Sequence, residues 1–298
     1  MTSRKLLAAA ALPLAFLATV APATAKRLST VASFTVLADV VKQVGGDHVR
    51  VTSLVGPNGD PHAFEPSPQD AQQLKSADLV FVSGLGLEGW MDRLIAASGY
   101  AGRPVVVSEG MRTLTMEEDG ATVTDPHVWN SPTNVEAWVT VIETALAKAD
   151  PDDAADFEAN AEAYTGKLKE LDGLAHALFS GIAKDERKVL TSHDAFGYFA
   201  RDYGVAFLSP VGLSTDAEPS AADVAKLITQ IRAEKVKVYF FENSSDPRLV
   251  KQIAAATGAE PGGELYVEAL SEPSGPAPDY ATMFRRNVEL LSGAMRTQ

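Results

Sequence analysis

Short apolar runs and amphipathic stretches alternate along the chain from Leu28 onward, and many of the amphipathic stretches end at glycine. This alternation is typical of βαβ units that build parallel sheets. In the first half the pattern predicts strands over residues 28–34, 49–55, 78–83 and 105–108, and helices over 36–44, 67–75, 86–97 and 132–148. In the second half it predicts strands over 188–192, 205–209, 236–241 and 264–269, and helices over 195–203, 221–233, 247–257 and 280–296. We therefore predict an α/β fold with two lobes of four β/α units each.

A long amphipathic segment separates the two halves. It begins with Asp150-Pro151-Asp152-Asp153, where proline at the first helical position and acidic residues in the first turn favour a helix start. Apolar residues then recur every three or four positions from Phe157 to Ile182, which predicts one buried stripe. A helix over 151–183 would be about 50 Å long, so we interpret it as a rigid connection between the lobes. The expected divisions are an N-terminal lobe over 26–149, a linking helix over 150–183 and a C-terminal lobe over 184–298.

The first 25 residues resemble a secretory signal peptide. Arg4 and Lys5 precede an apolar run over 6–20, and Ala23-Thr24-Ala25 supplies the small residues of a cleavage site. The run is shorter than the ~20 residues that a membrane-spanning helix needs. Because the chain contains no cysteine, we expect a free periplasmic protein that is not attached to lipid through that residue.

Composition narrows the classes of function. The 298 residues include 26 Lys and Arg against 39 Asp and Glu, which gives a formal net charge of −13 and argues against nucleic acid as a partner. The absence of cysteine excludes a disulfide framework, a thiol nucleophile and a thiolate metal site. Any metal must therefore be bound by nitrogen and oxygen.

Three of the five histidines follow predicted strands or lie in proline-stiffened loops. His62 and His127 each follow a proline, and His193 comes directly after the strand predicted over 188–192. In parallel α/β sheets, ligands bind beyond the carboxyl ends of the strands, so this placement favours a common site. We interpret His48 as a turn residue and His176 as a residue on the surface of the linking helix.

Four motifs resemble those of the zinc/manganese solute-binding proteins of ABC importers (cluster A-I, or cluster 9). They occur in order along nearly the whole chain after residue 25: Asp60-Pro61-His62-x-Phe64-Glu65-Pro66-x-Pro68-x-Asp70, Asp125-Pro126-His127-Val128-Trp129, Ser192-His193-Asp194-Ala195-Phe196-x-Tyr198-Phe199 and Asp279-Tyr280-x-x-Met283-x-x-x-Asn287. The resemblance implies two lobes and one metal ion bound between them by His62, His127, His193 and Asp279.

The ligand chemistry favours zinc. Three imidazoles and one carboxylate suit a closed tetrahedral Zn²⁺ site, whereas Mn²⁺ prefers more oxygen ligands. In the manganese-binding relatives the third ligand is typically glutamate where this chain has His193. Many zinc-binding relatives also carry a histidine-rich loop before the second ligand, whereas the loop over 111–125 here is acidic and lacks histidine.

Four acidic residues are candidates to orient the imidazoles: Asp60, Glu65, Asp194 and Glu242. Asp194 ranks lowest among them because it directly precedes a predicted helix that it could cap.

The resemblance implies a monomeric receptor, not an enzyme, that delivers Zn²⁺ to a membrane permease with its ATPase; a metal-donating protein is a further candidate partner. We expect no catalytic residue, since the chain has neither a phosphate-binding Gly-Lys-Ser/Thr loop nor a Gly-x-Ser-x-Gly elbow. A manganese receptor is one alternative. A second is a secreted zinc hydrolase in which Glu65 or Glu242 is the general base and Asp279 is not a ligand. A third is a metal-buffering protein without a transporter.

Overall fold

The computed structural model describes residues 27–118, 121–215 and 219–296. The predicted signal peptide lies outside these residues. Within the described part of the chain, no helix is both long enough and apolar enough to cross a membrane.

The N-terminal lobe is built on a four-stranded parallel sheet in the order β2-β1-β3-β4. Its strands are β1 Leu28–Ala32, β2 Val49–Ser53, β3 Leu79–Val82 and β4 Val105–Val106. Its helices are α1 Thr35–Gly45, α2 Pro68–Ser76, α3 Met91–Ser98 and α4 Pro132–Ala149. Helix α2 begins where the sequence predicts, because Ser67 and Asp70 form a reciprocal capping box and Pro68 occupies the first turn.

The C-terminal lobe repeats this plan with a parallel sheet in the order β10-β9-β7-β8. Its strands are β7 Lys188–Leu190, β8 Ala206–Leu208, β9 Val238–Glu242 and β10 Glu260–Leu265. Its helices are α6 Gly197–Tyr203, α7 Ala221–Glu234, α8 Arg248–Thr257 and α9 Tyr280–Arg296. The predicted α/β fold with two lobes is confirmed.

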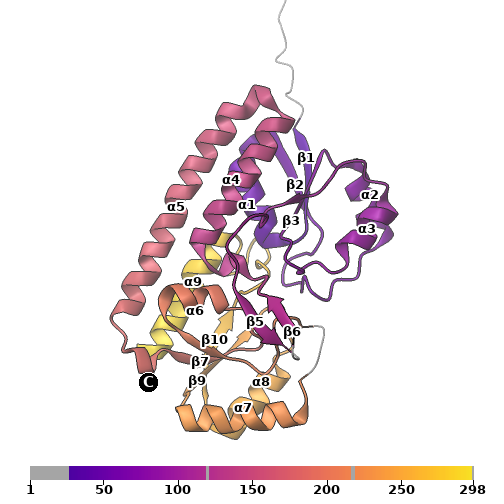
Figure 1. Cartoon of the computed structure of the whole chain (residues 1–298). Coiled ribbons are helices and arrows are strands. Elements are labelled where there is room, and N and C mark those ends of the chain that lie inside the picture. The colour runs from indigo at the N-terminus through magenta and orange to yellow at the C-terminus, as the bar shows by residue number, and fades with distance from the viewer. Residues whose placement is uncertain (1–26, 119–120, 216–218, 297–298) are drawn as a thin grey trace, which may run out of the picture.

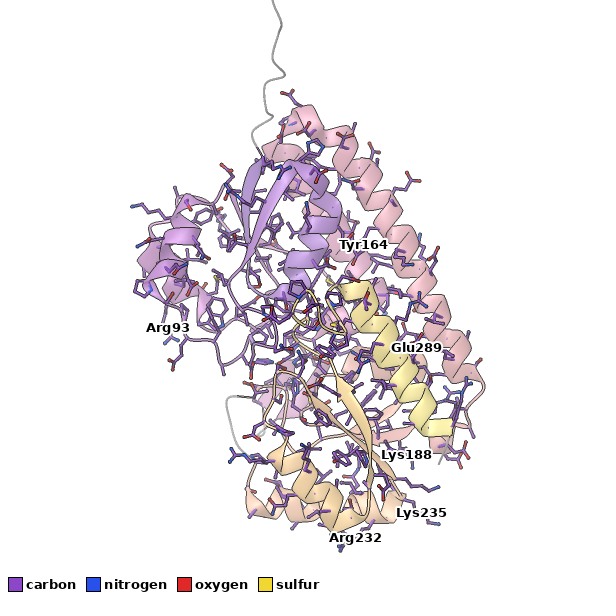
Figure 2. The ribbon with its side chains drawn as sticks, turned by 180° about the vertical axis from the view of Figure 1, so that it is seen from behind. Arg93, Tyr164, Lys188, Arg232, Lys235 and Glu289 are labelled. Atoms are coloured by element: carbon purple, nitrogen blue, oxygen red, sulfur yellow. The ribbon has the colours of Figure 1, made fainter. Side chains whose placement is uncertain are left out.

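The long connection is helix α5, Ala154–Ser180, which follows a 3₁₀ turn at Pro151–Asp153. Its 27 residues span about 40 Å. The predicted stripe faces inward, with six buried side chains from Phe157 to Phe179. Helix α5 packs against α1, α4 and α9, so it contacts elements of both lobes (Figure 1). Figure 2 shows α9 beside α5 from behind, with Tyr164 on α5 and Glu289 on α9.

The acidic loop and strand β10 differ most from the predictions. The acidic loop contains an antiparallel hairpin, β5 Thr115–Glu118 and β6 Ala121–Thr124, which threonine and valine favour. Strand β10 ends at Leu265, although the sequence pattern predicts a strand over 264–269. The Pro-Gly-Gly run at its start conceals the strand in the sequence, yet a side chain at Gly262 would collide with the ring of Phe240 on β9. Sheet packing therefore selects glycine there.

Candidate metal centre

Three histidines from three different connections converge between the lobes. His62 lies in the loop after β2, His127 lies between β6 and α4, and His193 follows β7. Their exposed fractions are 9 %, 0 % and 1 %. The ring centroids are 5.3 Å apart for His62 and His127, 5.2 Å for His127 and His193, and 6.2 Å for His62 and His193. The structure therefore brings all three predicted histidines together.

A buried glutamate completes this cluster. Oε1 of Glu268 lies 2.8 Å from Nε2 of His62, 3.2 Å from Nε2 of His127 and 3.3 Å from Nε2 of His193. The four ligand atoms lie within 4.8 Å of one another, and Glu268 itself is fully buried. Three imidazole nitrogens and one carboxylate oxygen thus face a single point, which is a donor set for a divalent transition metal.

Asp279 does not lie in this cluster, so the expected fourth position has to be corrected. Its carboxylate accepts hydrogen bonds from the backbone N–H and the hydroxyl of Thr282, both at 2.8 Å. These bonds satisfy donors in the first turn of α9, which is the usual role of an aspartate directly before a helix. The structure brings Glu268 to the histidines in its place.

The sequence did contain a signal for Glu268. Because β10 ends at Leu265, Glu268 follows the carboxyl end of a parallel strand, as His193 does. The strand predicted over 264–269 instead places this glutamate inside the sheet, away from the edge at which ligands bind.

Carboxylates hold two of the imidazoles from the side opposite the cluster. Nδ1 of His127 donates to Asp125 at 2.9 Å, and Nδ1 of His193 donates to Glu242 at 2.5 Å. Such contacts fix the tautomer that leaves Nε2 available to a metal. Glu242 is one of the four acidic residues predicted for this role, whereas Asp125 is not among them.

The other acidic candidates contact the cluster less directly. Asp60 accepts a hydrogen bond from the backbone N–H of His62 at 2.8 Å. Glu65 is exposed. Asp194 is half-buried, and its backbone N–H donates to carbonyl oxygens of the loop after β8. It does not cap α6, because that helix begins at Gly197 and Phe196 precedes it.

Two aromatic residues form hydrogen bonds with the backbone around the centre. The indole N–H of Trp129 donates to the carbonyl of Val267 at 2.7 Å, and the hydroxyl of Tyr280 donates to the carbonyl of Trp129 at 2.8 Å. Since Val267 precedes Glu268 and Trp129 lies two residues after His127, these bonds set the relative position of two members of the cluster.

Electrostatics in the centre favour protons on the imidazoles of His127 and His193 when no metal is bound. Burial lowers the pKa of His193, but the neighbouring Glu242 and Glu268 carboxylates raise it more, so the pKa lies well above the ordinary histidine value. Burial raises the pKa of Glu268, yet His193 and His62 outweigh it and hold that pKa well below the usual range. A metal ion must therefore displace protons to bind.

The two remaining histidines lie elsewhere. His48 contacts Asp153 at 2.6 Å and Asp156 at 3.0 Å, which ties the turn before β2 to the start of α5. His176 lies on α5 near Asp172 and against the ring of Tyr203. Both agree with a structural interpretation.

The fold and the centre define a two-lobe metal-binding substrate receptor. A family model described as "Zinc-uptake complex component A periplasmic" matches residues 30–294. The chain belongs to this family, the cluster A-I metal receptors, whose members are substrate-binding proteins of transporters.

Similar proteins and solved structures agree with this family assignment. The chain is 33 % identical over 272 residues to the iron-binding protein YfeA of Yersinia pestis, covering 90 % of this chain and 86 % of that protein. It is 34 % identical over 283 residues to the manganese-binding lipoprotein MntA of Bacillus subtilis, covering 91 % and 90 %. The periplasmic zinc-binding protein TroA of Treponema pallidum superposes with a TM-score of 0.85 at 28 % identity, covering 90 % of this chain and 99 % of TroA.

These relatives correct the expected localisation. MntA is named a lipoprotein, and so are FimA of Streptococcus parasanguinis and PsaA of Streptococcus mitis. Their names contradict the prediction of a protein without a lipid anchor. The lack of cysteine in this chain bears only on attachment through that residue.

Proposed function

We propose that the protein binds one Zn²⁺ through His62, His127, His193 and Glu268, and delivers it to an ABC-type importer made of a permease and an ATPase. The supporting observation is the convergence of four buried ligand atoms, three nitrogens and one oxygen, within 4.8 Å. The proposed lobes are residues 26–149 and 184–298, joined by the helical segment 150–183.

Zinc is favoured over manganese and iron by the donor set. Three imidazoles and one carboxylate satisfy a tetrahedral ion of the size and softness of Zn²⁺, whereas Mn²⁺ seeks further oxygen ligands. The names of MntA and YfeA support manganese or iron as the alternative cargo.

The zinc hydrolase alternative is less well supported. It requires an open fourth position, but Glu268 lies at that position. Its proposed base Glu242 already accepts hydrogen bonds from the ring of His193 and from the backbone N–H of Ser192. The other proposed base, Glu65, is exposed. A metal-buffering protein differs from a receptor only in that it has no transporter partner.

Competitive titration tests the choice of metal. Protein stripped with a chelator is titrated with Zn²⁺ and Mn²⁺, separately and in competition, and bound metal is measured by elemental analysis. We expect one Zn²⁺ per chain and a Zn²⁺ affinity at least about 100-fold higher than that for Mn²⁺, in line with the Irving–Williams order and the donor set. Displacement of Zn²⁺ by an equimolar amount of Mn²⁺ would favour the manganese alternative.

A further inference from the structure

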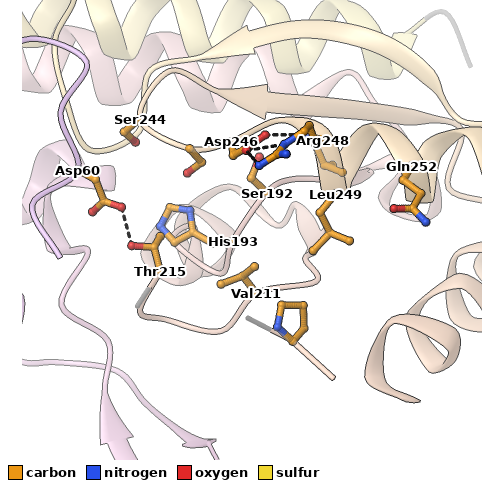
Figure 3. A pocket seen from close by; sticks show the side chains of 13 residues that line it. Asp60, Ser192, His193, Val211, Thr215, Ser244, Asp246, Arg248, Leu249 and Gln252 are labelled. Atoms are coloured by element: carbon orange, nitrogen blue, oxygen red, sulfur yellow. Dashed lines mark hydrogen bonds and ion pairs between the residues drawn. The ribbon is translucent and has the colours of Figure 1, made fainter. Parts of the chain in front are cut away.

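A cavity of about 610 Å³ lies directly beside His193 (Figure 3). At its outer rim the side chains of Arg248 and Asp246 are 90 % and 52 % exposed, whereas that of His193 at its inner end is 1 % exposed. The cavity therefore leads from solvent to His193, the one member of the metal cluster among its described lining residues.

The cavity has a mixed lining, with apolar side chains such as Leu249 and Val250 and with hydroxyl groups near the carboxylates of the centre. Ser192 lines the cavity, but its Oγ is itself buried and has no hydrogen-bond partner within the described part of the chain. Oγ of Ser244 lies 3.5 Å from Glu268, and Oγ of Ser245 lies 3.4 Å from Glu242. Hydroxyl oxygens can donate and accept, so such a wall is able to exchange contacts with the water shell of a hydrated cation.

One hydrogen bond between the lobes crosses the cavity. Among the described lining residues, Asp60 alone comes from the N-terminal lobe, and its Oδ2 accepts a hydrogen bond of 2.6 Å from the hydroxyl of Thr215 in the C-terminal lobe. Figure 3 shows this bond beside His193.

The same carboxylate also holds the loop that contains His62. Oδ1 of Asp60 accepts from the backbone N–H of His62 at 2.8 Å and from that of Ala63 at 3.4 Å. Since the carboxylate is shared, a movement of Asp60 away from Thr215 shifts His62 as well. Thr215 thus acts on a histidine of the centre through Asp60, without being part of the cluster.

We propose that the cavity beside His193 is the path by which the metal ion is exchanged, and that Asp60 and Thr215 are positioning residues whose hydrogen bond limits the rate of exchange. This inference rests on the proposed function, because it concerns passage of the ion to the same centre. Loss of the bond frees the His62 loop, so the metal should leave faster while the four ligand side chains stay in place.

The variant Thr215→Val tests the bond, since it keeps the shape and removes the hydroxyl; Thr215→Ser is the matched control that keeps the hydroxyl. Stopped-flow transfer of bound Zn²⁺ to an excess of chromogenic chelator gives the release rate, and equilibrium titration gives the stoichiometry. We expect one Zn²⁺ per chain in all three proteins. Release from Thr215→Val should be about ten-fold faster, because this variant loses one hydrogen bond to a charged group, and Thr215→Ser should release Zn²⁺ at the native rate. Equal release rates for valine and native proteins, or equally fast release from both variants, would overturn the role of the bond.

A second variant tests the path itself. Leu249 lines the cavity and is not part of the cluster, so Leu249→Trp fills the space with a bulkier side chain. We expect slower loading and slower release at unchanged stoichiometry, and native rates in both directions would overturn the cavity as the path. A native protein that fails to bind Zn²⁺ would instead contradict the proposed function.

Discussion

The imidazole of His193 combines burial with two neighbouring carboxylates, and this combination couples metal binding to pH. The pKa of His193 is raised well above the ordinary value, because Glu242 and Glu268 outweigh the effect of burial. The pKa of His127 is also raised, since Asp125 and Glu268 outweigh its burial. Protons therefore compete with the metal at pH values above the usual histidine pKa as well as below it.

We expect the apparent Zn²⁺ affinity to fall by at least about 100-fold between pH 7.5 and pH 5.5, because more than one imidazole must lose its proton to bind metal. The decline should already be measurable between pH 8 and pH 7. Competition with a chelator of known pH dependence provides the measurement. An affinity that stays flat across this range would argue against ligation by histidine.

At the residue scale the sequence predicted the histidines well and the carboxylate poorly. His62, His127 and His193 stand in recognisable motifs directly after strands or prolines. Glu268 stands in no such motif, and its role depends on where β10 ends. Asp279 lies at the start of a helix in a motif, yet its position in space is set by the packing of α9, which the local sequence does not encode.

At the scale of elements, two carboxylates, those of Asp39 and Asp279, lie close together at the start of α9. Asp39 on α1 accepts a hydrogen bond of 2.9 Å from the backbone N–H of Tyr280, close to the carboxylate of Asp279. Burial raises the pKa of Asp39 to about 6, with a further contribution from Asp279, although the Tyr280 and Gln43 hydrogen bonds lower it. The folded protein thus binds a proton at Asp39 that the unfolded chain releases near pH 3.8. The free energy of unfolding consequently decreases as pH rises from about 4 to 6.

The variant Asp39→Asn should remove this cost and keep an oxygen acceptor for Tyr280. We expect the metal-free protein to gain about 1 kcal/mol at pH 7.5, after allowance for the lost carboxylate at a helix N-terminus, and to gain nothing at pH 4.5. Urea unfolding of variant and native protein at both pH values measures the difference. Equal destabilisation at both pH values would contradict the raised pKa.

The boundaries of helices and strands could be predicted where the local sequence contains strong caps or a clear apolar stripe. They could not be predicted where packing against distant segments determines them. The capping box at Ser67 and Asp70 marked α2, and the apolar stripe marked α5. The β5–β6 hairpin and the glycine-containing start of β10 form because neighbouring segments pair with them, and pairing between distant segments is not visible in a local pattern.

At the scale of the whole molecule, α5 restrains the two lobes. It packs on α1 and α4 of the N-terminal lobe and on α9 of the C-terminal lobe, with the six buried side chains of its stripe spread from Phe157 to Phe179. A large hinge motion would expose this stripe to water. Release of the metal should therefore involve loop movement and a modest tilt of the lobes.

Small-angle X-ray scattering of metal-free and Zn²⁺-loaded protein tests this restraint. We expect radii of gyration that agree within about 1 Å, as for small shifts of packed elements rather than hinge closure. A clear compaction on binding zinc would show that α5 bends or that the lobes separate from it.

The central claim is that Glu268, and not Asp279, completes the metal centre with the three histidines. The most direct test is zinc titration of the chelator-treated native protein, Glu268→Ala and Asp279→Ala side by side. We predict one tightly bound Zn²⁺ per native chain and an affinity lower by at least about 100-fold in Glu268→Ala. Asp279→Ala should keep near-native affinity, because its loss destabilises the start of α9 and not the metal centre. A large loss of affinity in Asp279→Ala together with native affinity in Glu268→Ala would contradict the assignment.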